Sequence, residues 1–400
     1  MKKIKGKYGC AMIYATNIDE VTIQQVTDLM NQRFVEGLHV RIMADCHAGA
    51  GCVIGTTMKV IDCCVPNLVG VDIGCGMFTV FLGKINVDLE KLDEFIIDNI
   101  PCGEEVFEEN QLTKTDIRSL YCYDNLKHKK RFNRSNGTLG GGNHFIEIDK
   151  DEEDNLYLII HTGSRNLGLQ VCQHYMKVAY ENLKKRRDKV IKETVERLTK
   201  QNKQKLIQSE VDKIKRSYDL VNKDLLPLYD EDFKSYLHDM NICQQFAWEN
   251  RETIASKIMQ HLKLNFNDHK SFHTVHNYIN MNDMILRKGA ISAYKGEMVL
   301  IPINMKDGSI IAMGKSNGRY NFSAPHGAGR ILSRHQAKKT LSLDDFKEAM
   351  KGIYSSSICK STIDESPFVY KSIDDIIPNI LPTVDIVKII KPIYNFKTKN

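Results

Sequence analysis

Residues 68–82 read LVGVDIGCGMFTVFL, and this dense apolar run predicts a buried strand that is interrupted by glycines. Glycine weakens the interior of a strand, so Gly74 and Gly76 indicate a bulge or a close approach of two backbones. Asp72 and Cys75 stand three residues apart across this glycine turn. Both side chains can point into one pocket if the backbone folds back here.

Further strands and one helix flank this stretch. Residues 156–162 (LYLIIHT) predict a second buried strand with a polar end, and residues 8–16 and 38–45 predict two more. Asp19–Phe34 predicts an amphipathic helix, because Asp19 can cap it and the apolar residues form one stripe. Strand patterns return from residue 271, in SFHTVHNYI, GEMVLIPINM and GSIIAMG, and a helical pattern, LDDFKEAMKGIY, follows after residue 330.

Residues 172–223 differ from the rest of the chain in composition. They are rich in Lys, Arg, Glu and Gln, contain no glycine or proline, and carry apolar residues at roughly helical spacing. The segment predicts one or two long helices, forming an antiparallel hairpin that ends near Pro227. A solvated helical surface explains this composition, and the excess of Lys and Arg also allows the hairpin to face RNA.

These patterns together predict an α+β fold. We expect a single catalytic domain over residues 1–400, with mixed and antiparallel sheets around a central metal cleft and a charged helical insertion at 172–226. With 42% hydrophobic and 26% charged residues, the chain can bury a large core. The sequence has no apolar run long enough to cross a membrane, so we expect no membrane partner.

The cysteines and the net charge indicate the compartment and the kind of partner to expect. Eleven cysteines, an odd number, without an export signal predict free thiols in a reducing cytoplasm. The net charge of +6 is compatible with an anionic partner. Cys75 is the cysteine whose polar, glycine-rich surroundings suit a ligating thiol.

Several histidines lie beside glycines or at the ends of apolar segments, where loops display binding groups. A thiolate, a carboxylate and several imidazoles can hold two divalent ions, with the thiolate shared between them. None of these candidate residues has the close CxxC or HxxxH spacing of strong zinc sites, and a single histidine is more often a hydrogen-bonded core or surface residue. The histidines in question are His47, His144, His161, His276 and His326.

Three glycine-rich segments could approach phosphate groups. They are GTLGGGNH (137–144), GKSNGR (314–319) and HGAGR (326–330). Glycine lets backbone N–H groups come close to phosphate oxygens, and arginine adds a bidentate cation. The P-loop motif does not fit, because five residues separate Gly308 from Gly314 where the motif has four. Ordinary turns explain any one of these segments alone.

His326 is a candidate nucleophile. The Gly-Ala-Gly-Arg that follows it leaves room for a bulky adduct and places a cation nearby. A neutral imidazole can attack phosphorus and give a phosphoramidate that passes its phosphoryl group on. A histidine that caps the entry of a helix explains the same pattern, so both interpretations stay open on these residues alone.

Taken in order, the motifs resemble the RtcB family of tRNA-splicing RNA ligases. The resemblance extends from residue 45 to residue 372 and implies an enzyme that joins RNA 3′-phosphate or 2′,3′-cyclic phosphate ends to 5′-hydroxyl ends, in tRNA splicing or RNA repair. It is carried by DCHAGAGCVIGTTM, VGVDIGCGM, GTLGGGNHFIE, HTGSRNLG, HNY, RKGAISAYKGEMVLIPINMKDGS, HGAGRILSR and DESPFVYKSID.

The resemblance also implies cofactors and a catalytic residue. Such ligases use GTP and two manganese ions, and His326 corresponds to the guanylylated histidine that passes GMP to the RNA end. Cys75 is expected to bridge the two ions. The implied metal ligands are Asp72, Cys75, His144, His161 and His276.

A longer set of residues corresponds to the nucleotide-contacting positions of the family. Two departures point to a divergent branch: Ile303-Asn304 stands where many members have Gly-Ser, and the C-terminus PIYNFKTKN leaves Lys399 as an alternative to Lys397. The implied nucleotide contacts are Asn143, Phe145, Glu147, Asn277, Pro302, Asn304, Met305, Ser309, Gly327, Ala328, Gly329 and Lys397. Candidates for holding RNA phosphates are Arg165, Arg330 and Arg334.

Two other functions stay open. A dinuclear metal phosphodiesterase would need the same Asp, Cys and His residues but no adduct on His326. An inactive RNA-binding homologue would need only the basic segment at residues 172–223.

Overall fold

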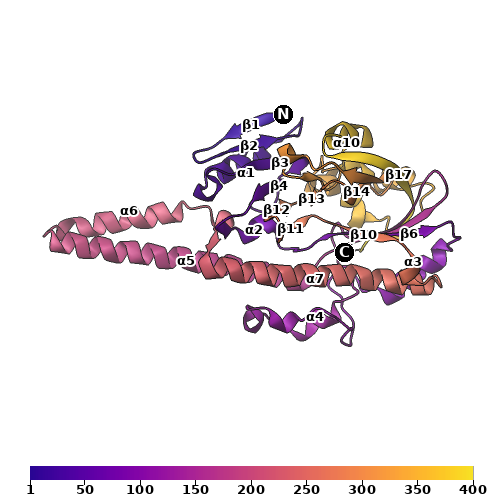
Figure 1. Cartoon of the computed structure of the whole chain (residues 1–400), viewed down its shortest axis with the longest axis horizontal. Coiled ribbons are helices and arrows are strands. Elements are labelled where there is room, and N and C mark those ends of the chain that lie inside the picture. Colours follow the sequence, from indigo (N-terminus) through magenta and orange to yellow (C-terminus); the bar gives the residue numbers. More distant parts are fainter. Residues whose placement is uncertain (400) are drawn as a thin grey trace.

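The computed structural model describes residues 1–399, in which helices and sheets alternate along the chain (Figure 1). Two large sheets contain most of the strands, so the predicted α+β class is confirmed. The helices are α1 Glu20–Met30, α2 Pro66–Val69, α3 Leu89–Asn99, α4 Lys130–Arg134, α5 Arg165–Lys200, α6 Ile207–Asp219, α7 Asp230–His261, α8 Arg334–Thr340, α9 Leu343–Ala349 and α10 Ile373–Ile380.

The first large sheet has the strand order β1-β2-β3-β4-β12-β11. Strands β2 and β3 run parallel, and α1 forms the crossover that such a pair needs. The buried face of α1 includes Val26, Leu29 and Met30, which belong to the same hydrophobic core as this sheet. The strands are β1 Lys2–Lys5, β2 Cys10–Ile13, β3 Val40–His47, β4 Ile54–Lys59, β11 Asn277–Asn280 and β12 Ile285–Lys288.

The second large sheet is antiparallel and has the order β10-β6-β8-β7-β17-β15-β14. Its register brings distant segments together, because Gly76 at the start of β6 pairs with both Thr162 and Val275. The strands are β6 Gly76–Gly83, β7 Phe145–Lys150, β8 Leu156–Thr162, β10 Ser271–Val275, β14 Met298–Asn304, β15 Gly308–Gly314 and β17 Val384–Phe396. Two small sheets join β13 Ala290–Ser292 to β16 Ser323–Pro325 and β5 Cys63–Cys64 to β9 Leu228–Tyr229.

Helix α7 fixes the loops where these strands end. The buried Arg251 donates from Nη1 to the carbonyls of Gly74 and Thr162, both at 2.8 Å. The buried Asn250 side chain donates to the carbonyl of Gly163 at 3.2 Å and accepts from the N–H of Gly137 at 2.7 Å. Two neighbouring side chains of one helix therefore satisfy the backbone of three loops that would otherwise be unpaired inside the protein.

The predicted helical hairpin is confirmed, and it begins earlier than predicted. Helix α5 starts at Arg165 and continues without a break to Lys200, and α6 returns antiparallel beside it. Figure 1 shows both helices extending well beyond the sheets, while α7 runs along the sheet region. The hairpin is thus an extension of a core helix, because residues such as Leu167, Val171 and Tyr175 are buried in the main core.

Two predicted elements have different boundaries. The predicted helix Asp19–Phe34 ends at Met30, and a short 3-10 turn, Arg33–Val35, follows it. Asp19 caps the helix as expected, accepting from the N–H of Thr22 at 2.8 Å.

The predicted strand over residues 68–82 is wrong in its first half. Pro66 begins the short helix α2, because proline suits the first turn of a helix, and β6 begins only at Gly76. Residues 70–75 form a loop in which Gly70 and Gly74 have φ angles of +103° and +73°. Such angles suit glycine and are incompatible with a regular strand. Within the described residues, no helix is long and apolar enough to cross a membrane.

Candidate active site

Residues from both large sheets line one cavity of about 420 Å³. All of the predicted site residues line it except His144, Ser309 and Arg165. Residues more than 320 positions apart in the sequence therefore meet in one cleft. The additional residues that line it are His47, Ala50, Ile54, Gly70, Val71, Met77, Lys288, Gly289, Ile303, Glu365 and Tyr370.

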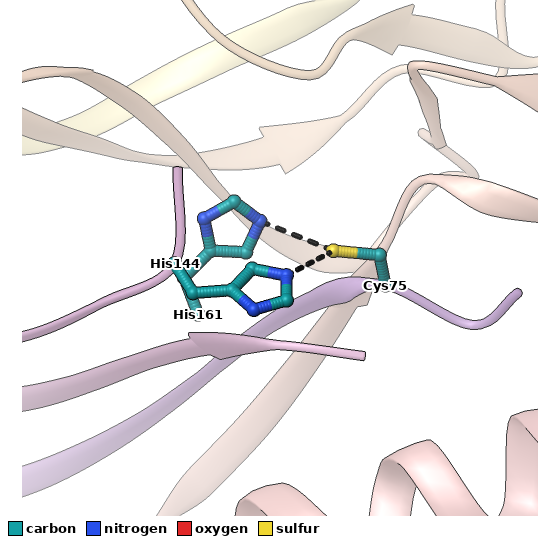
Figure 2. A group of neighbouring side chains, drawn as sticks. All are labelled: Cys75, His144 and His161. Carbon is teal, nitrogen blue, oxygen red and sulfur yellow. Dashed lines mark hydrogen bonds between the residues drawn. The ribbon is translucent and has the colours of Figure 1, made fainter. Parts of the chain in front are cut away.

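Cys75, His144 and His161 form a buried cluster (Figure 2), and Cys75 and His161 also line the cleft. The Cys75 sulfur lies 3.5 Å from Nε2 of His144 and 3.4 Å from Nε2 of His161. Cys75 directly precedes β6, His144 directly precedes β7, and His161 lies near the end of β8, the strand paired with both. Strand pairing thus brings together three candidate ligands that stand 69 and 17 residues apart in the sequence.

Asp72 and His276 extend the cluster on two sides. Asp72 Oδ2 lies 3.0 Å from Nε2 of His144. The ring of His276 lies 5.2 Å from the ring of His161, and the N–H of His276 donates to the carbonyl of Cys75 at 2.9 Å. Gly163 must be glycine here, because a Cβ at this position would lie 2.1 Å from Oδ1 of Asp72.

The donor set fits divalent metal ions. With the bond lengths of zinc, about 2.3 Å to sulfur and about 2.0–2.1 Å to nitrogen, two ligands at a tetrahedral angle lie about 3.5 Å apart. The two separations from Cys75 Sγ agree with this value. His144 also donates from Nδ1 to the carbonyl of Leu139 at 3.0 Å, which directs its Nε2 lone pair toward the sulfur.

The charges of these ligands suit a cation as well. Burial holds the pKa values of His161 and His276 well below their ordinary range, so both rings are neutral and can coordinate. Burial also raises the pKa of the Cys75 thiol well above its usual value, and nearby Asp72 raises it further. A metal ion would reverse this effect and favour the thiolate.

Asp45 orients His326 at the edge of the cluster. Its buried Oδ2 accepts from Nδ1 of His326 at 2.6 Å and from the N–H groups of His326 and Gly327 at 2.9 and 3.2 Å. Since Nδ1 carries the proton of this bond, Nε2 is left with the lone pair. The ring of His326 lies 5.0 Å from that of His276, and Gly329 permits the close packing, because a Cβ there would lie 2.6 Å from the Asp45 carbonyl.

Glu147 and Lys397 also line the cleft. Asn395 donates to Glu147 Oε1 at 2.5 Å. Burial raises the pKa of Glu147 to about 7, although Lys397 and Asn395 act in the opposite direction. The Lys397 ammonium lies 3.4 Å from Glu365 Oε2 and 4.9 Å from the ring centre of Phe145. Lys397, and not the exposed Lys399, is therefore the terminal lysine in the cleft.

The three predicted arginines occupy different positions. Arg330 and Arg334 line the cleft, and each pairs with Glu365, at 3.2 and 2.9 Å. Arg334 also keeps 48% of its side chain exposed, so it can reach a ligand from solvent. Arg165 does not line the cavity, since its guanidinium donates to Thr138 Oγ1 at 3.0 Å and to the carbonyl of Gly103 at 2.7 Å.

The side chains of two predicted nucleotide contacts are directed toward the protein itself or buried within it. The side chain of Asn304 closes the turn between β14 and β15, accepting from the N–H groups of Lys306 and Asp307 and donating to the Asp307 carboxylate at 2.8 Å. Ser309 is fully buried and does not line the cleft, and its hydroxyl has no partner among the described residues.

Asp45, Glu365 and Lys288 are site residues that the sequence did not single out. Lys288 lines the cleft and donates to the carbonyl of Asn67 at 2.8 Å, without a carboxylate within 4.0 Å in the described part of the chain. All three do stand in quoted motifs: Asp45 in DCHAGAG, Lys288 in RKGAIS and Glu365 in DESP. The roles of Asp45 and Glu365 depend on the side chains that tertiary folding places beside them, and the spacing of residues along the chain does not reveal these pairs.

A cluster that could hold a metal ion, close to an oriented imidazole, is the kind of site that enzymes use for chemistry on phosphate groups. The family is set by comparison with known proteins. A model of the family described as tRNA-splicing ligase RtcB matches residues 25–125 and 121–398. The chain therefore belongs to the RtcB family of tRNA-splicing ligases and is an enzyme of the RNA ligase class, as the motif resemblance predicted.

Curated relatives resemble the chain over most of its length. The RNA-splicing ligase RtcB of Escherichia coli K12 is 28% identical over 387 residues, which cover 87% of each chain. The tRNA-splicing ligase RtcB of Methanococcus maripaludis is 27% identical over 424 residues, covering 84% of this chain and 82% of the relative. The RNA-splicing ligase RtcB2 of E. coli ATCC 25922 is 25% identical, covering 90% and 87%.

Proposed function

We propose that this protein is a GTP- and manganese-dependent ligase that joins RNA 3′-phosphate or 2′,3′-cyclic phosphate ends to 5′-hydroxyl ends, in tRNA splicing or RNA repair. Membership of the RtcB family supports the RNA ligase class. The observation that carries the detailed chemistry is the 2.6 Å contact of Asp45 Oδ2 with His326 Nδ1 beside the metal-binding cluster. The eleven free cysteines suit a reducing compartment, and we propose the cytoplasm.

The residues of the cleft suit two manganese ions. Asp72, Cys75 and His144 would hold one ion, and Cys75, His161 and His276 the other, with the sulfur shared. This division follows the contacts, since Asp72 lies beside His144 and His276 beside His161. When bound, such ions neutralise phosphate charge and orient the attacking group.

His326 would carry GMP between GTP and the RNA. Its Nε2 lone pair attacks the α-phosphorus of GTP, a P–N bond forms, and pyrophosphate leaves. An oxygen of the RNA 3′-phosphate then attacks the same phosphorus, the P–N bond breaks, and an activated RNA–GMP end results. The 5′-hydroxyl attacks the RNA phosphorus and loses its proton, and GMP leaves. A cyclic phosphate end would first be hydrolysed to a 3′-phosphate.

The guanine would lie near Glu147 and Lys397. An ionised Glu147 can accept from the N1 and N2 hydrogens of guanine, and Lys397 can donate to its O6. Both side chains line the cleft, and the Phe145 ring beside Lys397 offers an apolar surface. Adenine presents the opposite pattern of donors and acceptors at these positions, so this arrangement favours GTP over ATP.

A covalent adduct tests the proposal. The protein is incubated with α-labelled GTP and manganese and separated on a denaturing gel, alongside His326→Ala and the control His335→Ala, an exposed histidine nine residues away. We expect a labelled band in the wild type and the control, and none in His326→Ala. An equal band in His326→Ala overturns the nucleophile. RNA-end hydrolysis without an adduct would indicate the phosphodiesterase, and RNA binding without joining of tRNA halves the inactive homologue.

A further inference from the structure

The outer part of the α5–α6 hairpin, residues 184–216, holds the excess positive charge of the whole protein. We call this segment the arm. It contains thirteen Lys and Arg against five Asp and Glu, a net charge of +8, whereas the complete chain carries +6. The other residues contain 43 basic against 45 acidic side chains and are close to neutral. The protein is therefore a nearly neutral body with one strongly basic extension.

The charges of the arm are exposed and mostly unpaired. All thirteen basic side chains are exposed except the partly buried Arg187. Within the described residues, carboxylates lie within 4.0 Å of three of them, in the pairs Arg187–Asp188, Lys189–Glu193 and Lys213–Glu210. Solvation alone does not account for this pattern, because acidic and basic residues solvate a helix equally well and like charges repel one another. An unbalanced basic surface of this kind attracts a polyanion.

The arm is rigidly connected to the active site. Helix α5 begins at Arg165, four residues after the metal-binding His161, and continues without interruption to Lys200. At about 1.5 Å per residue, Lys184 and Lys200 lie roughly 28 and 53 Å along the helix from its start. This distance corresponds to roughly one to two turns of a nucleic-acid duplex. Figure 1 shows that this part of the helix extends beyond the sheets, where it is accessible to a large ligand.

A second basic segment contacts the first turns of α5. Residues 127–134 (KHKKRFNR) carry five Lys and Arg and no acidic residue. They are attached to the base of α5, because the N–H of Lys127 donates to Gln170 Oε1 at 2.7 Å and Gln170 Nε2 donates to the Lys127 carbonyl at 3.1 Å. Positive charge is thus present at the base of the helix and again along its outer half.

We propose that the arm binds the sugar-phosphate backbone of a duplex region of the RNA substrate, one to two helical turns from the broken ends held in the cleft. This inference rests on the proposed function. The arm contains no aromatic residue on which unpaired bases could stack. Flexible, exposed Lys and Arg side chains suit phosphates, and double-stranded RNA is recognised mainly through its backbone and shape.

The test compares two substrates and two charge-matched variants. One variant carries Lys→Gln at Lys192, Lys200, Lys205 and Lys215, which are exposed and have no carboxylate within 4.0 Å among residues 1–399. The control carries Lys→Gln at Lys2, Lys3, Lys5 and Lys7, exposed lysines around β1. The long substrate is a broken hairpin with a stem of about 20 base pairs, and the short one is a pair of ends of fewer than ten nucleotides. KM and kcat for ligation are measured for both, at several salt concentrations.

We expect the arm variant to raise KM for the long RNA roughly tenfold or more and to reduce the salt dependence of binding by up to about three units of log–log slope. KM for the short ends, kcat and guanylylation should stay unchanged, and the control variant should match the wild type. If the arm variant leaves KM for the long RNA unchanged, the proposal is overturned. The positive charge of the arm would then serve to bind a partner other than the RNA substrate. Equal losses on both substrates also overturn it.

The inference and the proposed function fail in distinguishable ways. If the wild type ligates neither substrate, the proposed function is wrong, and binding of the 20-base-pair stem is then measured directly. Weaker binding by the arm variant than by the control would still support the arm as an RNA-binding surface, and equal binding would overturn it.

Discussion

Asn at position 45 would test whether the carboxylate sets the reactivity of His326. Asp45 Oδ2 accepts three hydrogen bonds, from the His326 ring and from two backbone N–H groups. Asp45→Asn preserves the size of the side chain but removes its charge. If the amide oxygen of the Asp45→Asn side chain accepts the same three hydrogen bonds, the His326 ring keeps its orientation. The ring then loses only the negative charge that stabilises a positive charge on the imidazole. If the amide nitrogen faces the ring, the proton moves to Nε2 and the nucleophilic lone pair is lost.

The expected loss lies between these two cases. A hydrogen bond to a charged group contributes about 1.5–3 kcal/mol, which corresponds to roughly 10- to 150-fold in rate. In the Ser-His-Asp triad of proteases, which are unrelated enzymes, an aspartate orients the histidine in the same way. There the wrong histidine tautomer lowers kcat by about 10⁴-fold. We therefore expect Asp45→Asn to slow guanylylation by roughly 10²- to 10⁴-fold.

Single-turnover labelling with α-labelled GTP measures this rate directly. Asp62→Asn, the same exchange at an exposed residue, is the matched control. GTP affinity and Tm should stay close to wild type in both variants, because the substitution preserves shape. Guanylylation by Asp45→Asn within threefold of wild type would refute the orienting role. A large fall in Tm or in GTP affinity would show that Asp45 acts mainly on the structure.

Three further predictions concern manganese binding, recognition of the guanine of GTP, and the stability of the fold. Cys75→Ala should lower bound manganese, measured by elemental analysis, because one sulfur contacts both His144 and His161; Cys10→Ala should not, and full occupancy in Cys75→Ala would contradict a shared sulfur. Glu147→Gln should raise KM for GTP roughly 10- to 100-fold, while the exposed Glu152→Gln leaves it unchanged; an unaltered KM in Glu147→Gln would remove this residue from the base site. Burial raises the pKa of Asp151, but hydrogen bonds from Lys388 and Asn155 outweigh it, so its pKa is lowered and its ionised form stabilises the fold. Asp151→Asn should therefore reduce the free energy of unfolding by about 2 kcal/mol at pH 7, and this difference should shrink as the pH falls below about 4; urea titrations that show a constant difference would contradict the assignment.

Local patterns along the chain predicted several elements well. The strand over residues 156–162 and the charged hairpin depend on continuous runs of residues, and apolar periodicity reports such runs directly. The pattern predicts a strand where residues 70–75 form a loop, because residues 68–82 are mostly apolar and burial alone does not separate a packed loop from a strand. Helix α7 explains the difference, since Arg251 satisfies the carbonyl of Gly74 in a conformation that a strand does not have.

The sequence by itself determined the inventory of the site: a thiol, carboxylates, histidines and glycines in an order that marks one family. Only the tertiary structure decided how they are grouped. Cys75 lies between His144 and His161 because β6, β7 and β8 are neighbours in one sheet. Asp45 accepts a hydrogen bond from His326, which stands 281 positions later in the chain. Glu365 forms ion pairs with Arg330, Arg334 and Lys397. These pairs are set by packing between distant segments, and such contacts have no period or spacing in the chain.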